Sequence, residues 1–179
     1  MTKQLELIDV NPSHIDLLYN WRNQDHIREV MFDSREIAYY NHKKWFSSVL
    51  ENENVYYKVL TVDHVPYGVA NFHYTNKNDR IGYWGFYIGE VKAPKGMGTI
   101  LCTKMLDFLF WELNVHKVCA EVLAFNERSL GFHEKMGFKK EGILKEHTFK
   151  DNKYIDVHLY GIFKSEWTLK KSLLNKKNS

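Results

Sequence analysis

Hydrophobic and polar residues follow two different periods along this chain. Residues 5–10, LELIDV, alternate at every second position, which predicts a strand. Residues 11–23 and 41–52 carry apolar side chains at helical spacing, and Asn11 or Ser13 is expected to cap the first of these helices. Three stretches rich in Val, Tyr, Phe and Ile then end in turn residues and predict consecutive antiparallel strands: 54–63, 67–76 and 80–90.

Helices and strands alternate in the second half of the chain. Residues 97–113 predict a long helix, 117–125 a strand, and 126–138 a helix closed by a glycine. Residues 139–163 predict a strand pair around KDNK, and a short helix is expected after them. The order βααβββαβαββ predicts an α/β (α+β) fold with a single mixed, mostly antiparallel sheet flanked by helices.

Length and charge favour one globular domain. With 179 residues the chain is expected to form a single domain over 1–179, in which 165–179 is a terminal helix and tail. The end of the chain, 169–179, holds four lysines, whereas the net charge is only +3. We interpret this end as a solvated, fraying terminus, because nucleic-acid binding needs a broader basic face. No nucleic-acid partner is therefore expected.

Cysteines, histidines and apolar runs exclude several other classes. Cys102 and Cys119 lack the spacing of a disulfide framework or a zinc site and are expected to be buried thiols. No histidine pair has convincing ligand spacing, so no metal is expected. No apolar run has the length of a membrane span, and the N-terminus does not resemble a signal peptide. We expect a cytoplasmic protein with no membrane partner.

The stretch APKGMGTIL, residues 93–101, joins a predicted strand to a predicted helix. The first N–H groups of a helix have no partner within it, and the helix dipole adds partial positive charge there. Gly96 and Gly98 let a phosphate approach the backbone, Lys95 adds a full charge, and Thr99 offers a hydroxyl. The stretch therefore suits a phosphate or pyrophosphate, with a plain turn as the alternative. It is not a P-loop, because the lysine precedes the glycines.

A second motif, NERSLGFHEKMGF at 126–138, follows the next predicted strand. In order and spacing, the two motifs and the strands between them resemble the GNAT family of acetyl-CoA-dependent N-acetyltransferases over Tyr67 to Phe138. The resemblance implies the GNAT fold, acetyl transfer to an amine, and acetyl-CoA as the cofactor, with coenzyme A as product. Ala93 departs from the family, which usually has Arg or Gln there, and Lys95 is expected to replace part of the lost charge.

The resemblance also implies a cofactor site. The pyrophosphate of coenzyme A would lie on the glycine turn, whose residues are Lys95, Gly96, Met97, Gly98 and Thr99. The pantetheine arm would pair with the backbone of a strand, which would also help to bind the thioester oxygen; the strand residues are Phe86, Tyr87 and Ile88. Asn126 would hydrogen-bond the pantetheine, and Lys135 would reach the 3′-phosphate.

Three residues are candidates for the chemistry: Glu121, His133 and Tyr87. Attack by a neutral amine needs a base, and Glu121 interrupts an apolar strand, where a desolvated carboxylate would suit a base acting through water. The alternative is a glutamate that faces solvent. His133 stands where many GNAT members have a tyrosine that protonates the thiolate, and an imidazolium would perform this step. The alternative is a histidine that only lines the cofactor site. Tyr87 would act through its backbone.

Cations and aromatic side chains gather in the N-terminal third, a combination that suits a flat base and a phosphate. The pattern WRN…IR…M…I…H..WF and the stretch IGYWGFYIG resemble a GNAT branch that acts in pseudaminic acid biosynthesis. That branch acetylates the 4-amino group of UDP-4-amino-4,6-dideoxy-N-acetyl-β-L-altrosamine. The resemblance implies a small-molecule nucleotide-sugar substrate, held by Arg22, Asn23, Met31, Phe32, His42 and Trp45.

Two further polar residues and several alternatives complete the picture. Asn71 and His73 share one face of a predicted strand and would hydrogen-bond a polar acceptor. Core packing is the alternative for Met31 and Trp45, and a salt bridge or a cap is the alternative for Arg22 and His42.

Two other functions remain open. One is acetylation of protein N-termini, as in the ribosomal-protein alanine or serine acetyltransferases, and the other is a non-catalytic coenzyme A-binding sensor. Polyamines are less expected, because they need a carboxylate-rich pocket. A homodimer through a sheet edge is possible.

Overall fold

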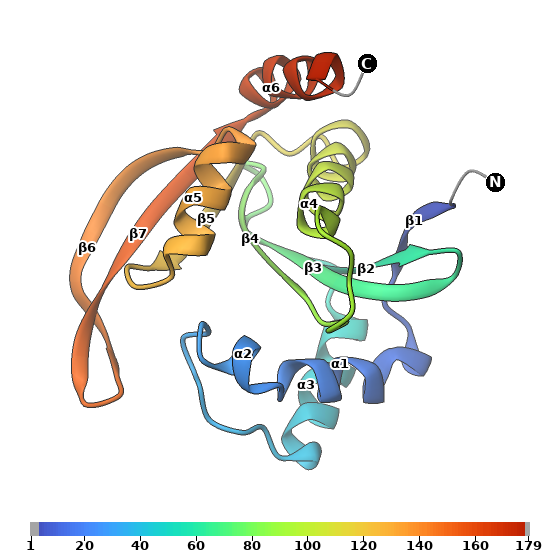
Figure 1. Ribbon diagram of the computed structural model, residues 1–179, viewed down its shortest axis with the longest axis vertical. Helices are drawn as coiled ribbons and strands as arrows, with labels where there is room; N and C mark the ends of the chain where they lie inside the picture. The colour runs from blue at the N-terminus through green and yellow to red at the C-terminus, as the bar shows by residue number, and fades with distance from the viewer. Residues whose placement is uncertain (1–3, 178–179) are drawn as a thin grey trace. The chain divides into compact units, whose positions relative to one another are not determined.

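The computed structural model describes residues 4–177, and its elements follow the predicted order with short helices added (Figure 1). The strands are β1 Leu5–Asp9, β2 Val55–Val62, β3 Val65–Asn76, β4 Ile81–Ile88, β5 Lys117–Leu123, β6 Lys139–Lys150 and β7 Lys153–Phe163. The helices are η1 Pro12–His14, α1 Ile15–Arg22, α2 Asp25–Arg28, α3 Tyr39–Glu51, α4 Met97–Asp107, η2 Phe108–Glu112, α5 Glu127–Met136 and α6 Lys164–Lys177.

The sheet has seven strands in the order β1-β2-β3-β4-β5-β7-β6. Strands β1–β2, β2–β3, β5–β7 and β6–β7 pair antiparallel, whereas β4 and β5 pair parallel and are therefore joined by a crossover through α4. This confirms the predicted mixed, mostly antiparallel sheet flanked by helices. The pattern could not show α2, because a helix of four residues is too short for a periodic signal.

The described chain divides into two compact units. Unit 1 contains the residues up to His73 together with Gly85–Met105, and unit 2 contains Tyr74–Trp84 together with the residues from Leu106 onward. Each unit is described separately below. The prediction of a single domain over 1–179 stays a prediction.

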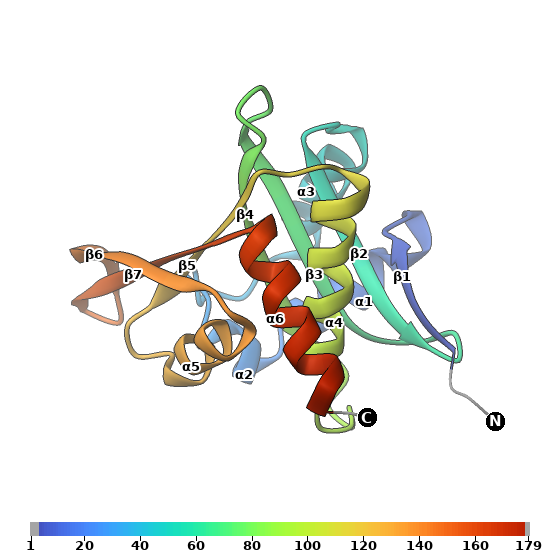
Figure 2. The same ribbon diagram turned by 90° about the horizontal axis from the view of Figure 1, so that it is seen from above.

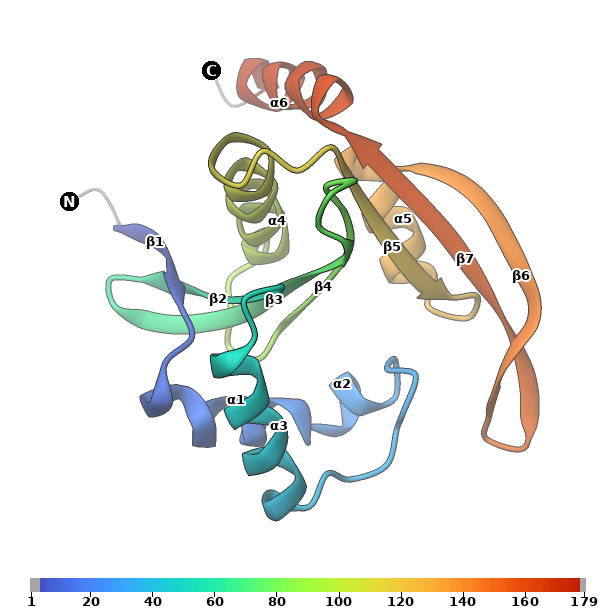
Figure 3. The same ribbon diagram turned by 180° about the vertical axis from the view of Figure 1, so that it is seen from behind.

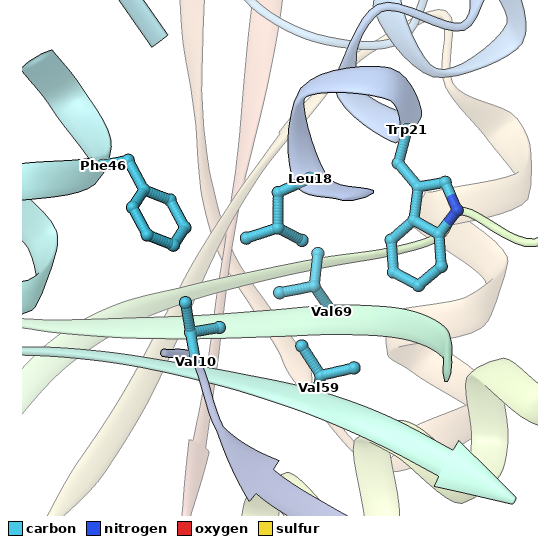
Figure 4. Packing of buried hydrophobic residues seen from close by; sticks show 6 residues of the cluster. All are labelled: Val10, Leu18, Trp21, Phe46, Val59 and Val69. Atoms are coloured by element: carbon cyan, nitrogen blue, oxygen red, sulfur yellow. The ribbon is translucent and has the colours of Figure 1, made fainter. Parts of the chain in front are cut away.

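Unit 1 has a core between its helices and its sheet. Helices α1 and α3 lie on one face of β1–β3, and α4 lies on the other face (Figures 1 and 3). Figure 4 shows how α1 and α3 direct their apolar side chains toward the strands. The buried cluster consists of Val10, Leu18, Trp21, Phe46, Val59 and Val69. Burial of such side chains, each contributing about 1.5–3 kcal/mol, holds the helices on the sheet.

Trp21 at the end of α1 rests directly on the backbone that follows β4. A Cβ atom at Gly89 would lie 2.0 Å from the Trp21 ring, so only glycine fits there. Two hydrogen bonds fix the same segment, from the Gly89 N–H to the Tyr67 carbonyl at 3.0 Å and from Gln24 Nε2 to the Gly89 carbonyl at 3.0 Å. The end of α1 is therefore locked to the end of β4 within unit 1.

Unit 2 is built on the long β6–β7 hairpin, which pairs with β5 (Figure 3). The turn residues Asp151 and Asn152 both have positive φ, as a tight two-residue hairpin turn requires, which confirms the predicted strand pair around KDNK. Apolar residues of β5 and β7 form a buried cluster, whose members are Leu123, Ile155 and Val157.

Helix α6 follows directly from β7 (Figure 2). Trp167 in α6 is fully buried, and its indole N–H donates to Asp107 Oδ1 at 2.9 Å. Lys171 Nζ lies 2.7 Å from the other oxygen of the same carboxylate. These contacts anchor the first half of the helix, and the expectation of a solvated, fraying end over 169–179 stays a prediction.

The predicted helix at 97–113 is present, but its last turn is a π-helix at Phe108–Glu112, with the Leu113 N–H bonded to the Phe108 carbonyl at 3.1 Å. Cys102 and Cys119 are buried free thiols, as predicted. Among the described helices, none has the length and apolar character needed to cross a membrane.

Candidate functional site

The glycine turn of unit 1 is built to expose backbone donors. Gly96 has φ 95°, and a Cβ placed on it would meet no atom within 4 Å, so the space beside it is open. The Met97 N–H bonds to the Pro94 carbonyl, and the Ile100 N–H bonds to the Gly96 carbonyl. Within the described residues, the N–H groups of Gly98 and Thr99 have no backbone partner. Two free donors, a helix N-terminus and the exposed Lys95 fit the pyrophosphate of coenzyme A.

The end of β4 is held by a second glycine. A Cβ at Gly68 in β3 would lie 2.7 Å from the Tyr87 carbonyl oxygen, so the close approach of the two strands requires glycine there. The parallel ladder between β4 and β5 ends at Tyr83, three residues before Phe86. The backbone of Phe86, Tyr87 and Ile88 thus lies beyond that ladder, as a strand that pairs with pantetheine would need.

Arg22 and Asn23 organise the loop between α2 and α3. Asn23 makes two hydrogen bonds with one residue: its Nδ2 donates to the Ile37 carbonyl at 3.0 Å, and its Oδ1 accepts from the Ile37 N–H at 2.9 Å. Arg22 Nη2 donates to the Asp33 carbonyl at 2.9 Å. The sequence predicted substrate contacts for Arg22 and Asn23, and the structure gives both a loop-holding role.

One nitrogen of Arg22 takes part in none of these contacts. Its Nη1 is buried and has no hydrogen-bond partner in the part of the chain that the structure describes. Burial lowers the pKa of Arg22, but a guanidinium keeps its charge in proteins. The nearest electrostatic partners include Tyr87, Asp33 and Tyr57. A buried donor without a partner is costly, so this nitrogen fits an acceptor atom on a ligand.

Tyr57 and Tyr87 line the same region of unit 1 and pack against its core. Burial raises the pKa of Tyr57 to about 12 and also raises the pKa of Tyr87. Both phenols therefore stay neutral at physiological pH. Sequence reasoning missed Tyr57, and no local signal distinguishes it from other strand tyrosines.

His42 lies inside an aromatic cluster. It is only 2% exposed, and its Nε2 donates to the Ile15 carbonyl at 2.8 Å. Four rings surround it, those of Tyr19, Tyr39, Trp45 and Phe46. His42 therefore joins α3 to α1 and supports Trp45, a residue that is 37% exposed.

The remaining residues predicted to contact the acceptor differ in how exposed they are in unit 1. Phe32 is 44% exposed, and Met31 beside it is half-buried. Asn71 is opposite Tyr57 in the β2–β3 register, and a Cβ at Gly85 would lie 3.3 Å from its Nδ2. His73, two residues further along β3, is exposed. Asn71 is thus the better placed of the two strand residues to meet a group near β4.

His133 in unit 2 is enclosed by aromatic rings and is 4% exposed. The rings of Trp84, Phe138 and Tyr160 lie 5.0–5.7 Å from its centroid. Its Nδ1 lies 2.8 Å from the Ser129 carbonyl, which can only accept, so Nδ1 carries the proton. Burial lowers the pKa of His133, which is therefore neutral near pH 7. A neutral imidazole lacks the charge of the predicted imidazolium acid, and the role of His133 in catalysis stays a prediction.

Glu121 in β5 is exposed, although its neighbours Ala120 and Val122 are buried. The expectation that this carboxylate is desolvated is therefore wrong, and the alternative of a solvent-facing glutamate holds. A base that works through water is compatible with this exposure. The role of Glu121 in catalysis stays a prediction.

Asn126 caps α5 as the motif requires. Its side-chain oxygen accepts from the Ser129 N–H at 3.1 Å, which leaves the Nδ2 donor for a ligand. Gly137 ends the helix with φ 96°. Lys135, in the last turn, is exposed. The helix cap, the helix itself and the exposed lysine thus lie at the positions that the sequence motif predicted.

A comparison with known families places residues 10–159 in the acetyltransferase (GNAT) domain family. The SPbeta prophage-derived N-acetyltransferase YokL of Bacillus subtilis is 31% identical over 130 residues, which cover 72% of this chain and 73% of YokL. The putative ribosomal N-acetyltransferase YdaF of the same organism is 30% identical, but the match covers 54% of this chain and 51% of YdaF. Acetyltransferase PseH of Campylobacter jejuni is 24% identical over 77% of this chain and 85% of PseH.

Solved structures show the same fold. Spermidine N-acetyltransferase from Vibrio cholerae, in complex with CoA and spermine, matches with a TM-score of 0.85 at 22% identity, over 92% of this chain and 98% of that one. The chain thus belongs to the GNAT acetyltransferase family and is an acetyl-CoA-dependent N-acetyltransferase. The fold, the activity and the cofactor that the two motifs predicted are confirmed.

Proposed function

We propose that this acetyl-CoA-dependent N-acetyltransferase acetylates the 4-amino group of a UDP-linked 4-amino-4,6-dideoxy sugar, by direct attack of the amine. The observation that carries the proposal is Arg22 in unit 1. The residue is half-buried and charged, and its buried Nη1 has no partner among the described residues. A diphosphate offers the charged acceptor oxygens that a guanidinium binds best.

The aromatic cluster around His42 supports the same acceptor. Trp45 presents a partly exposed ring on a rigid support, and a flat base stacks on such a ring. Phe32 adds a second exposed ring. We propose that these rings and Met31 hold the nucleobase, that Arg22 binds the diphosphate, and that Asn71 and His73 bind polar groups of the sugar. His42 and Asn23 would position this set rather than touch the substrate.

A polyamine acceptor fits this region less well. A cationic substrate would be repelled by Arg22, and specificity arises as much from such repulsion as from attraction. Two of the carboxylates in this region are already paired: Asp33 makes two hydrogen bonds with the Arg35 guanidinium, at 2.9 and 2.7 Å, and Asp25 pairs with Arg28. The spermidine acetyltransferase of similar fold thus serves as a guide to the fold alone.

The residues of the cofactor site are proposed from the two sequence motifs and from the local contacts within each unit. Acetyl-CoA supplies the acetyl group as an activated thioester. We propose that the free N–H groups of Gly98 and Thr99, with Lys95, hold its pyrophosphate. Asn126 Nδ2 and the backbone beyond Tyr83 would orient the pantetheine, and Lys135 would meet the 3′-phosphate.

Proton transfer needs a path away from the amine. Glu121, exposed in β5, is the proposed base and would take the proton through water. His133 is neutral with its proton on Nδ1, so we assign it to holding the ring cluster and not to proton donation.

The test is thiol release from acetyl-CoA with three acceptors: the UDP-4-amino sugar, spermidine, and a peptide with a ribosomal-protein N-terminus. Rapid release with the sugar alone supports the proposal. Release with the peptide alone would favour the ribosomal-type function instead, to which the 30% identity with YdaF points. Acetyl-CoA binding without any transfer would favour the coenzyme A sensor.

Two matched variants then locate the acceptor. Arg22→Met removes the half-buried guanidinium but keeps a long side chain, whereas Arg35→Met removes an arginine whose side chain is 87% exposed. A hydrogen bond to a charged group contributes about 1.5–3 kcal/mol, so Arg22→Met should raise KM for the sugar by about tenfold or more. Neither variant should change KM for acetyl-CoA. Equal effects of the two variants on the sugar would contradict the role of Arg22.

A further inference from the structure

Unit 2 contains a cavity that none of the residues discussed above lines. It lies where β4 and β5 begin and where β7 runs into α6, and its volume is about 240 Å³. A water molecule occupies about 30 Å³ of liquid, so the cavity has room for a small organic molecule or an anion with its hydration. Its lining includes Arg80 before β4, His116 before β5 and Lys164 at the start of α6.

Five of the seven lining residues are basic or polar. Besides Arg80, His116 and Lys164, the cavity presents the polar side chains of Asn114 and Ser165 and no carboxylate. Phe163 forms an apolar wall, with the His116 ring at its edge at 5.4 Å between centroids. A cavity with several cations, no acid and one aromatic wall fits an anion that also carries an apolar part.

Two acids of unit 2, Glu141 and Glu166, are already engaged with other residues. Glu141 accepts from Lys117 Nζ at 2.7 Å. Glu166 accepts from the Phe163 N–H at 3.0 Å and pairs with Lys139. The Arg80 guanidinium, in contrast, makes no side-chain hydrogen bond or ion pair with any other residue that the structure describes. Its charge is therefore available to a ligand.

The lining is held in place by the backbone. The Arg80 carbonyl accepts the N–H of His116 at 2.8 Å and that of Lys117 at 3.4 Å, so the segments before β4 and β5 are tied together. Lys164 Nζ lies over the Trp111 ring at 5.9 Å. The start of α6 is fixed by Trp167 and Lys171, which both bond to Asp107. A preformed site of this kind does not lose much entropy on binding.

We propose that this cavity binds a small anion, a carboxylate or an organic phosphate, at a site separate from the residues of acetyl transfer. Arg80 is its main charged contact, Lys164 and His116 add charge and donors, and Phe163 packs against the apolar part. The enzyme would then bind this anion in addition to its cofactor and its acceptor.

Titration calorimetry tests the proposal, with inorganic phosphate and citrate as separate probes. The protein is first saturated with coenzyme A, so that the probes do not report on the glycine turn. Saturable binding of either probe is expected, and the stronger one identifies phosphate or carboxylate as the preferred group. Arg80→Gln should weaken it by about tenfold or more, as expected for a charged hydrogen bond.

Lys77→Gln is the control, because it removes one positive charge from the same loop without touching the cavity. Lys77→Gln should bind like the unmodified protein. Ser165→Glu adds a negative charge to the lining and should abolish binding of the anion. This second variant keeps the proposal testable if Arg80→Gln fails to fold. Absence of saturable binding, or equal binding by Arg80→Gln and the unmodified protein, would overturn the proposal.

Discussion

Asn23 offers a sharp test of how the acceptor region is built. Its side chain makes two hydrogen bonds, at 3.0 and 2.9 Å, to the carbonyl and the N–H of Ile37. Both are partly buried, and each such bond contributes about 0.5–1.5 kcal/mol. Asn23→Ala removes both and leaves the two Ile37 groups without partners. We expect a loss of about 1–3 kcal/mol in the free energy of unfolding.

Urea denaturation measures this loss, and a graded series makes it specific. Asn23→Asp keeps the acceptor for the Ile37 N–H but loses the donor, so it should cost less than the alanine variant. Asn20→Ala, on the exposed face of the same helix, is the matched control and should change stability by less than about 0.5 kcal/mol.

Kinetics separate local from global damage. The loop that Asn23 holds runs from Asp33 to Ile37 and follows Met31 and Phe32, the proposed base contacts. Asn23→Ala should therefore raise KM for the acceptor and leave KM for acetyl-CoA unchanged. Equal stability of Asn23→Ala and Asn20→Ala, or parallel rises of both KM values, would refute this reasoning.

Three further predictions concern Gly89, Gly96 and His133. Gly89→Ala should cost about 1–3 kcal/mol, seen in urea denaturation, because its Cβ would lie 2.0 Å from the Trp21 ring; no loss would show that the ring shifts freely. Gly96→Ala should lower the free energy of unfolding by about 1–2 kcal/mol, because φ is 95°, and should raise KM for acetyl-CoA. The control Gly131→Ala, at an open helical position, should raise the free energy of unfolding by up to about 1 kcal/mol. The reverse order of the two variants would contradict the turn geometry. Burial lowers the pKa of His133 below 6.5, so the unfolded chain binds more protons as the pH falls through that value, and stability is lost on acidification. His133→Phe should flatten the profile of unfolding free energy between pH 7 and 5, and an unchanged slope would show that His133 is not the cause.

Local signals predicted much of the fold. The helix at α5 follows from residues within its own segment, since Asn126 caps it and Gly137 ends it. The β6–β7 hairpin follows in the same way from Asp151 and Asn152, which tolerate positive φ. The two coenzyme A motifs could be identified because each is a short, continuous stretch.

The candidate site was less accessible from sequence, because its contacts join distant segments. Gly89 lies 68 positions after Trp21, and nothing near either residue indicates that they touch. The rings that bury His133 come from β4 and β7 as well as from its own helix end, so its neutral state could not be inferred locally. Glu121 could be interpreted as a desolvated or as a solvent-facing carboxylate, because its neighbours in the strand are apolar. Only the structure shows that it is exposed.

Direct binding of UDP tests the central claim, that the cationic and aromatic region of unit 1 holds a nucleotide diphosphate. Calorimetry with UDP would be run on the unmodified protein, on Arg22→Met and on Arg35→Met, with spermidine as the competing ligand. The account predicts saturable UDP binding that Arg22→Met weakens by about tenfold or more and Arg35→Met leaves intact. Binding of spermidine without binding of UDP, or UDP binding that does not depend on Arg22, would contradict it.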